Sequence, residues 1–426
     1  MKRYEKYKPT GIQWLPEIPE HWKVQRFGSL FKRKVVANDP SKELLSVFLD
    51  RGVIKASESD KRTHQASDDL SKYQLVEPTD FVMNNQQAWR GSVGVSNFIG
   101  IISPAYHLFA MPSCYNPHYA NYLLRDRVMV NLYDMSSKGV GSIQRTLNFN
   151  WLNNGKCILP SITEQNKIVA YLNKRITLIE NCKCQREREL RTLNELKQAE
   201  IASVVTRGLN PDVPMVYMDT PLKTKHPSHW KRVRNMTFLI EQTEKVGKQA
   251  DDYQLLSLTT NGIIVRDVES GKGKFPKDFE SYKVVEPGEL VFCLFDIDET
   301  PRTIGLSQNH GMITGAYDVF KVKEDIVNPS FVYAFYLVID NIKALKPYYS
   351  GLRKVVKHNR FMQIGFALPP IEEQNAIVEY IESKTNKIDT MIEALKAEID
   401  RLTEYKQRLI SDVVTGQIDV RGEQIQ

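Results

Sequence analysis

The sequence predicts an α+β protein in which two mixed α/β domains are joined by two long antiparallel helices, a coiled coil, in a pseudo-twofold arrangement. Three observations carry this prediction. The chain repeats itself about 209 residues further on, each copy ends in a long amphipathic stretch, and each stretch follows short β-branched and aromatic runs between Gly, Pro and Asn turns. At 426 residues with 42% hydrophobic content, the chain can build two or three packed cores.

The repeat is most faithful where the long stretches begin. The segment 159–166, LPSITEQN, returns as 368–375, LPPIEEQN, and the register then holds without a gap to 204–206 and 413–415. Upstream markers recur in the same order, at 21–23 and 229–231, 73–78 and 282–287, and 105–106 and 316–317. Because the copies diverge between these markers, we expect one scaffold that presents two different globular parts.

The repeat divides the chain into four parts. We expect an N-terminal segment and first domain over 1–158, a long helix over 159–207, a connector and second domain over 208–367, and a second long helix with a tail over 368–426. Within the domains, composition and turn residues predict strands at 81–83, 106–109, 290–292 and 317–320, and helices at 117–132 and 329–345.

Both long stretches combine a helix start signal with an apolar seam. Ser161 or Pro370 lies near the start and carboxylates follow, which suits the first turn and the positive end of the helix dipole. In the second copy, apolar residues recur at alternating spacings of four and three, the pattern of a coiled coil: Ile388, Ile392, Leu395, Ile399, Leu402 and Leu409. The first copy instead places Lys183 and Arg186 at two of these positions. We therefore expect the apolar seam of the first helix to be narrower or more hydrated in its middle.

Chain order predicts how the two helices pair. The first helix begins at the first domain and ends at the second, and the second helix begins there and can only return. We therefore expect antiparallel helices, each covering the apolar stripe of the other. Twofold symmetry of this kind matches the two strands of a DNA duplex, which proteins read as half-sites.

Composition indicates which kinds of binding partner and which cellular compartment to expect. A net charge of +7 and a pI of about 8.9 lean toward a polyanionic partner, although an excess this small is also common in proteins that bind none. The five cysteines form no CxxC pair and no cluster with zinc-finger spacing, so neither a disulfide framework nor a zinc site is predicted. The chain shows no cleavable signal and no apolar run of ~18 residues, so we expect a cytoplasmic protein without a membrane span.

Several short motifs stand in a fixed order along the chain. They are the opening 7–23 with GIQWL and IPEHWK, the segments 88–96 and 103–106, and the repeated Leu-Pro-x-Ile-x-Glu-Gln at the two helix starts. Together they resemble the specificity (S) subunit of type I DNA restriction-modification systems. The second half departs from that family's pattern, because 221–226 lacks the Gly-x-x-Trp-Leu segment and 296–303 lacks the Ala-Trp-x-Gly pattern.

This resemblance implies a non-catalytic DNA-binding subunit. In that family, two target-recognition domains each read one half of a split sequence in double-stranded DNA, and the helices fix the gap and dock adenine methyltransferase subunits. We assign this docking to Glu164, Gln165, Glu373 and Gln374 at the helix starts. No cofactor is expected in this chain, because S-adenosylmethionine, ATP and Mg²⁺ belong to the methyltransferase and motor-nuclease subunits of the family.

The best candidate for direct reading of bases is the run 84–90 in the first domain. Arg, Asn and Gln side chains carry the paired donors and acceptors that match guanine or adenine in the major groove. Five such residues follow a predicted strand and precede a glycine turn: Asn84, Asn85, Gln86, Gln87 and Arg90. The alternative is a polar surface loop in which Asn84 or Asn85 turns the chain and Trp89 packs in the core.

A second candidate in the first domain is the run 136–145. Its glycines would let backbone amides approach a phosphate group, and Lys138 and Arg145 would supply charge. We also assign Ser142 and Gln144 of this run to the DNA-binding set.

The second domain offers phosphate contacts more than base contacts. Arg353, Lys354 and Lys357 occupy the place equivalent to the second run of the first domain. Lys272, Lys274 and Arg302 are further candidates. For each of these cations the alternative is a solvated surface charge, which is the commoner role of basic runs.

Two other functions compete with DNA recognition. Asn116-Pro117-His118-Tyr119 resembles the Asn-Pro-Pro-aromatic motif of adenine methyltransferases, but an Asn cap followed by Pro in the first helical turn explains both this segment and 328–331. The sequence also contains no glycine-rich turn for S-adenosylmethionine and no P-loop. A structural coiled-coil adaptor whose globular ends bind proteins is the third class, and the helices alone do not distinguish it.

Overall fold

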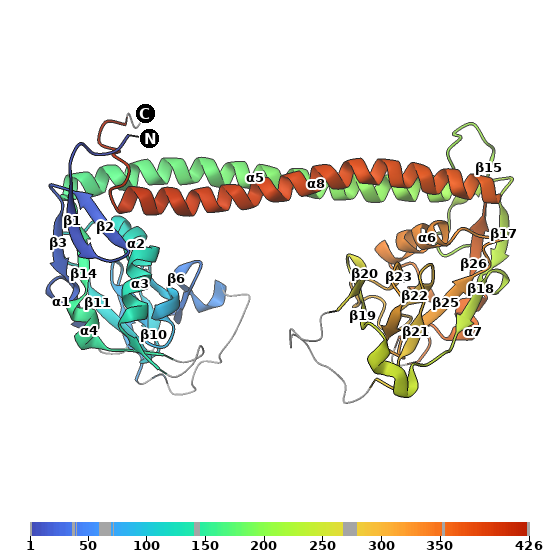
Figure 1. Cartoon of the computed structure of the whole chain (residues 1–426), viewed down its shortest axis with the longest axis horizontal. Helices are drawn as coiled ribbons and strands as arrows, with labels where there is room; N and C mark the ends of the chain where they lie inside the picture. Colours follow the sequence, from blue (N-terminus) through green and yellow to red (C-terminus); the bar gives the residue numbers. More distant parts are fainter. Residues whose placement is uncertain are drawn as a thin grey trace. The chain divides into compact units, whose positions relative to one another are not determined.

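The structure divides into two compact units. This computed structural model describes residues 2–35, 39, 41–58, 70, 72–139, 145–266, 279–351 and 354–423. Unit 1 comprises Met1–Arg186 and Ala397–Gln426, and unit 2 comprises Glu187–Lys396. Each unit therefore contains one globular domain together with one half of each long helix, α5 (Ile162–Arg207) and α8 (Ile371–Val414), drawn in green and red in Figure 1.

Unit 1 is built on a four-stranded antiparallel sheet with the strand order β4-β11-β8-β9. Strands β14 and β3, β1 and β2, β10 and β7, β5 and β6, and β12 and β13 form two-stranded sheets beside it. The strands are β1 (Tyr7–Ile12), β2 (Leu15–Pro19), β3 (Lys23–Arg26), β4 (Lys32–Lys34), β5 (Leu45–Phe48), β6 (Gly52–Lys55), β7 (Gln74–Val76), β8 (Phe81–Asn84), β9 (Val93–Val95), β10 (Gly100–Ile102), β11 (Tyr106–Ala110), β12 (Ser137–Lys138), β13 (Thr146–Leu147) and β14 (Lys156–Leu159). The short helices are α1 (Phe27–Leu30), α2 (Pro117–Arg125), α3 (Arg127–Met135), α4 (Phe149–Asn154) and the 3-10 helices η1 (Ala56–Glu58) and η2 (Ala88–Arg90).

Unit 2 repeats this sheet with the order β18-β25-β22-β23 (Figure 1). Its two-stranded sheets pair β17 with β26, β15 with β16, β21 with β24, and β19 with β20. The strands are β15 (Met215–Tyr217), β16 (Lys225–Pro227), β17 (Lys231–Arg234), β18 (Leu239–Gln242), β19 (Leu256–Thr259), β20 (Gly262–Val265), β21 (Lys283–Val285), β22 (Leu290–Phe292), β23 (Ile304–Leu306), β24 (Gly311–Ile313), β25 (Asp318–Val322) and β26 (Gly365–Leu368). The helices are α6 (Pro329–Asn341), α7 (His358–Met362) and the 3-10 helices η3 (Asn235–Thr237), η4 (Gly247–Asp252) and η5 (Lys346–Tyr348).

The two units therefore share one scaffold, including the parts where their sequences diverge. Each strand of the larger sheet in unit 1 has a counterpart in unit 2 with the same neighbours. The tryptophans Trp22 and Trp230, which the repeat aligns, are both buried in their cores, at 0% and 3% exposure. The prediction of one scaffold carrying two different globular parts is confirmed, because the shared strand order persists through the divergent segments.

Most of the predicted elements are present, but one predicted helix is divided in two and the helix predicted over 329–345 ends at Asn341. The strands predicted at 81–83, 106–109 and 290–292 lie in β8, β11 and β22. The helix predicted over 117–132 is instead two helices, α2 and α3, because Asp126 ends the first and caps the second by accepting a 2.9 Å hydrogen bond from Val128 N. A carboxylate at an N-cap satisfies an amide that the helix leaves unpaired, which makes the break stable.

The long helices begin slightly later than predicted. Strand β14 runs through Leu159, so α5 starts at Ile162, and β26 runs through Leu368, so α8 starts at Ile371. Each Leu-Pro pair lies at the end of its strand, just before the helix begins. Proline has no amide N–H to donate to a strand ladder, so the strand ends there.

Ion pairs show that the helices run antiparallel in unit 1. Lys406 on α8 donates to Glu180 on α5 at 2.7 Å, and Arg186 on α5 donates to Glu398 on α8 at 3.0 Å. Residue numbers rise along one helix as they fall along the other, as the chain order predicts. Arg186, at a position predicted to be wetter, is half-buried beside the carboxylate of Glu398.

Unit 2 shows the same antiparallel packing. Lys197 on α5 donates to Asp389 on α8 at 2.6 Å, and Tyr380 on α8 donates to Glu200 on α5 at 3.4 Å. The seam residues Ile388 and Ile392 are 8% and 5% exposed.

No helix of the described residues is long and apolar enough to cross a bilayer.

Candidate nucleic-acid interface

The most faithfully repeated residues hold the start of each long helix to its own domain. Gln165 is fully buried at the start of α5. Its Nε2 donates to Cys114 O at 2.8 Å and to Pro160 O at 3.0 Å, and its Oε1 accepts from Asn116 N at 2.7 Å. Each hydrogen of the amide is bonded, so the side chain fixes the helix to the segment that precedes α2.

Gln374 makes the same set of bonds in unit 2. It is also fully buried, and its Nε2 donates to Ile326 O at 3.1 Å and to Pro369 O at 2.9 Å. Its Oε1 accepts from Asn328 N at 2.8 Å. We call this arrangement the glutamine clamp. Its bonds to backbone atoms explain why the residue repeats although the neighbouring domain sequences do not.

The glutamates before these glutamines also bond within the chain. Glu164 is 4% exposed and accepts from the Tyr4 hydroxyl at 2.6 Å, and its second oxygen lies 2.9 Å from Nε2 of His21. Glu373 lies 2.7 Å from Nε2 of His229. Docking of a partner by these glutamates and the clamp glutamines stays a prediction, and three of the four side chains are buried within the domains.

The segments that resemble a methyltransferase motif are helix caps. Asn116 accepts at Oδ1 from His118 N at 2.8 Å and Tyr119 N at 3.3 Å, with Pro117 in the first turn of α2. Asn328 caps α6 by accepting from Ser330 N at 2.8 Å. The predicted cap geometry is confirmed in both units.

The predicted base-reading run lies between β8 and β9 and is closed by its own side chains. Asn84 Oδ1 accepts from Gln86 N at 3.0 Å and Gln87 N at 3.2 Å, a local turn, so the predicted turning role of Asn84 is confirmed. Asn85 Oδ1 accepts from Leu147 N on β13 at 3.4 Å. Gln86 is exposed and Gln87 is half-buried.

Trp89 lies at the surface of this loop, and the alternative that placed it in the core is wrong. Its ring is half-buried and its Nε1 donates to Gln86 O at 3.0 Å. The guanidinium carbons of Arg90 and Arg145 lie 4.8 Å and 4.6 Å from the ring centroid. The structure thus brings together the two runs of the first domain that sequence reasoning had selected separately.

Lys138 extends this group along the β12–β13 pair. Lys138 pairs across the two strands with Thr146, the residue that follows Arg145. The Nζ of Lys138 lies 4.6 Å from the ring centroid of Trp151. Trp151 on α4 is 50% exposed. We call Trp89, Arg90, Lys138, Arg145 and Trp151 the cation–aromatic surface. Ser142 and Gln144 lie outside the described residues.

A buried histidine lies on the same sheet. His107 on β11 is 8% exposed, and its ring meets Phe149 edge-on at 4.6 Å. Within the described part of the chain, neither ring nitrogen has a hydrogen-bond partner. Arg33 covers Phe149 from 5.5 Å. Burial, together with the charge of Arg33, lowers the pKa of His107 to about 4. The imidazole is therefore neutral at physiological pH.

Unit 2 arranges its candidate cations differently. Lys354 Nζ lies 3.0 Å from Glu299 and 3.2 Å from Asp298, and these two carboxylates raise the pKa of Lys354. Both carboxylates belong to the segment between β22 and β23. A phosphate contact by Lys354 stays a prediction, and making it would require the lysine to leave two carboxylates.

Arg302 is engaged inside unit 2. Its guanidinium donates to Asp340 at 2.9 Å and to Asn341 at 3.0 Å, with side-chain exposures of 17% for Arg302 and 2% for Asp340. Lys343 also donates to Asp340 at 2.7 Å. This burial assigns Arg302 to domain stability and weighs against its predicted contact with DNA.

The remaining cations of the second domain divide into exposed and undescribed residues. Lys357 is exposed, and no carboxylate of the described residues lies within ion-pair distance of it. Lys272, Lys274 and Arg353 lie outside the described residues. Lys357 is therefore the predicted phosphate contact of unit 2 that its surroundings leave free.

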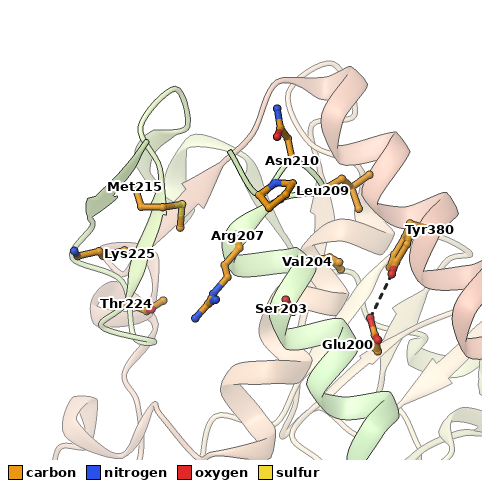
Figure 2. A pocket seen from close by; sticks show the side chains of 12 residues that line it. Glu200, Ser203, Val204, Arg207, Leu209, Asn210, Met215, Thr224, Lys225 and Tyr380 are labelled. Carbon is orange, nitrogen blue, oxygen red and sulfur yellow. Dashed lines mark hydrogen bonds between the residues drawn. The ribbon is translucent and has the colours of Figure 1, made fainter. Parts of the chain in front are cut away.

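A pocket of about 560 Å³ lies in unit 2 where α5 ends (Figure 2). Arg207 and Lys225 line it together with a single carboxylate, Glu200, which faces the hydroxyl of Tyr380. The connector and β15–β16 complete the lining. The pocket is thus a feature of the helix end and is separate from the loops that carry the predicted DNA contacts.

Sequence reasoning did not select Trp151 and Arg33, which the structure places against rings or cations near the candidate residues. Both lie beside residues more than ten positions away, Lys138 for Trp151 and Phe149 for Arg33, and no local motif marks Arg33. Aromatic residues interleaved with basic residues are a usable signal for nucleic-acid binding, and the run from Lys138 to Trp151 shows it.

Solved structures share this architecture. A chain from a type I restriction-modification system, solved to explain complex assembly and conformational transition, matches with a TM-score of 0.65 at 12% identity, over 94% of this chain and 99% of that one. This chain shares its fold with that chain of a type I restriction-modification system. The HsdS subunit from Thermoanaerobacter tengcongensis (15% identity, 94% and 98% coverage, TM-score 0.47) and the S subunit from M. genitalium (13% identity, 92% and 96% coverage, TM-score 0.34) superpose less well. No family model and no curated protein sequence matches the chain.

Proposed function

We propose that this chain is the DNA sequence-recognition subunit of a type I restriction-modification complex. Each domain would read one half of a bipartite target in double-stranded DNA. The observation that carries the proposal is one strand order built twice with different loops, in a chain that shares its fold over nearly full length with a type I restriction-modification chain. Equivalent scaffolds with unlike loops are what two unlike half-sites require.

The long helices would set the distance between the two half-sites. We infer that α5 and α8 form an antiparallel coiled coil in a pseudo-twofold arrangement, because ion pairs in both units give the antiparallel direction and each helix runs unbroken from one unit into the other. A helix of 46 residues reaches about 70 Å at ~1.5 Å per residue. A rigid spacer converts a fixed distance into a fixed number of unread base pairs.

Catalysis would belong to partner subunits that dock on the helices. Methyl transfer to adenine from S-adenosylmethionine would take place in methyltransferase subunits, and a motor-nuclease subunit would use ATP and Mg²⁺. The Asn-Pro segments support this division, since both asparagines already use their side chains to cap helices and to bond to the long helices.

A map of methylated adenines in host DNA, with and without this chain, tests the proposal. The expected result is a split motif with a constant gap that disappears with the chain. Persistence of the motif without the chain, or the absence of any split motif, would reject DNA recognition. Incubating the purified chain alone with labelled S-adenosylmethionine and DNA is the control, and methyl transfer in that reaction would place the active site here.

A further inference from the structure

Two arginines of unit 1 share one aromatic ring. The guanidinium carbons of Arg90 and Arg145 lie 4.8 Å and 4.6 Å from the centroid of Trp89, so their charges lie within about one Debye length, roughly 10 Å, of each other. Arg145 pairs with Asp134, whereas no carboxylate of the described residues lies within ion-pair distance of Arg90. Like charges this close repel, and an anion that contacts both guanidinium groups would offset the repulsion.

We propose that Trp89 is a positioning residue that holds Arg90 and Arg145 as a preformed clamp for phosphate groups of the DNA backbone. The inference rests on the proposed function and names the part of unit 1 that anchors the duplex. The two guanidinium groups would bind the phosphate groups, and the ring that both contact would hold them in place.

The loop holds the Trp89 ring in a fixed place. Its Nε1 donates to Gln86 O at 3.0 Å, and Gln86 N is itself bound by Asn84 Oδ1 at 3.0 Å. Gly91, with a φ of 99°, ends η2 in the left-handed region, where a side chain would be strained. The ring is therefore part of a closed turn, and the arginines stack on a support that does not need to be ordered on binding.

Stacking suits arginines that bind phosphate. A guanidinium that lies over a ring uses its face there and leaves its in-plane N–H donors free for the oxygens of a phosphate group. Lys138, beside Arg145 across the β12–β13 pair, adds a third cation over the exposed ring of Trp151. Three cations supported on aromatic rings, of which Arg145 pairs with Asp134, form a surface that suits a polyanion.

A salt titration of duplex binding tests the clamp. The full-length chain, purified with the subunits that copurify with it, is titrated with a labelled duplex of mixed sequence at increasing salt. Arg90→Ala and Arg145→Ala should each reduce the slope of log K against log salt by about 0.9. Trp89→Leu should also reduce it although no charge is removed, and Trp89→Phe, which keeps an aromatic ring but loses the Nε1 hydrogen bond, should reduce it less than Trp89→Leu does.

Matched variants separate positioning from folding. Arg175→Ala removes an arginine that lies 5.5 Å over the ring of Tyr171 on α5, and it should leave the slope unchanged. Thermal unfolding of Trp89→Leu and Trp89→Phe is measured in parallel. A reduced slope with an unchanged unfolding temperature supports positioning, and a reduced slope with a lowered unfolding temperature in Trp89→Leu alone assigns the ring to stability and overturns it.

The remaining outcomes also decide the question. If both alanine variants keep the wild-type slope while the wild-type complex binds duplex, the clamp is wrong and the proposed function stands. If affinity falls for one DNA sequence only, at constant slope, the arginines contact bases instead of phosphates. A wild-type complex that binds no duplex would reject the proposed function and the clamp together.

Discussion

The segment after β8 in unit 1 and the segment after β22 in unit 2 occupy equivalent places in the same strand order, but they arrange charge in opposite ways. In unit 1, Arg90 and Arg145 lie over the ring of Trp89. In unit 2, Asp298 and Glu299 hold Lys354. One scaffold can therefore present a cationic surface or a neutralised one, because the charges sit on loops and the strands below do not depend on them.

The glutamine clamp shows the opposite behaviour, since both units keep it unchanged. Its bonds lie at the helix starts, where the domains are attached. The repeat therefore preserves the contacts that join a domain to its helix and varies the loops that face outward.

Replacing Arg302 in unit 2 should reduce stability without changing DNA binding. Arg302→Ala leaves the buried carboxylate of Asp340 with Lys343 as its remaining cation, which should cost about 3 kcal/mol. Hydrogen exchange along α6 measures the loss. Lys357→Ala is the matched control, an exposed cation whose removal should leave exchange unchanged and lower the salt slope by about 0.9. The opposite pattern would make Arg302 the DNA contact.

Breaking the glutamine clamp should affect either unit alike. Gln165→Leu and Gln374→Leu each leave one backbone amide and two carbonyls without a partner, which should cost about 2–3 kcal/mol. Hydrogen exchange in the first turns of α5 and α8 reports each variant separately. As a control, Asn166→Ala removes an exposed hydrogen bond to Asn116 and should cost less than about 1 kcal/mol. Protection unchanged in one unit would show that the clamp is not shared.

Sequence patterns predicted the elements better than the site. Period and turn residues located the long helices and the strands β8, β11 and β22, because these signals are local. The role of Gln165 was not predictable, since its partners are the backbone atoms of Cys114, Pro160 and Asn116, which leave no mark on the sequence.

The same limit explains the candidate cations. Arg302 and Lys357 look alike in the sequence as basic residues on polar segments, and what separates them is Asp340, 38 positions away from Arg302. Ion pairing between residues so far apart in the sequence depends on the fold. The sequence therefore supplied the candidate cations, and the tertiary contacts show which of them are paired inside the domain and which are exposed.

Mild acid should destabilise unit 1 through His107. His107 has a folded-state pKa of about 4 against an ordinary value of 6.5, so stability is complete above pH 6.5 and is lost as pH falls toward 4. We expect a loss of the order of 1–2 kcal/mol near pH 5. The equivalent residue of unit 2, Asp318, is paired with Lys283 at 3.5 Å.

His107→Leu is the variant that isolates this effect. It removes the titrating group from the core of unit 1 and should flatten the pH dependence of hydrogen exchange in β11, after correction for the intrinsic exchange rate. A wild-type unit 1 whose protection at pH 5 equals that at pH 7 would contradict the assignment to His107.

Removing the carboxylates of unit 2 should make its loop behave more like that of unit 1. The double variant Asp298→Asn with Glu299→Gln frees Lys354 from both partners, so the salt slope of duplex binding should rise by up to about 0.9. Asp251→Asn, an exposed carboxylate of η4, is the control for the loss of negative charge. Adding Lys354→Ala to the double variant should return the slope to the wild-type value, whereas the same substitution in the wild-type background should change it little. A slope that Lys354→Ala lowers equally in both backgrounds would mean that the carboxylates do not hold the lysine back from DNA.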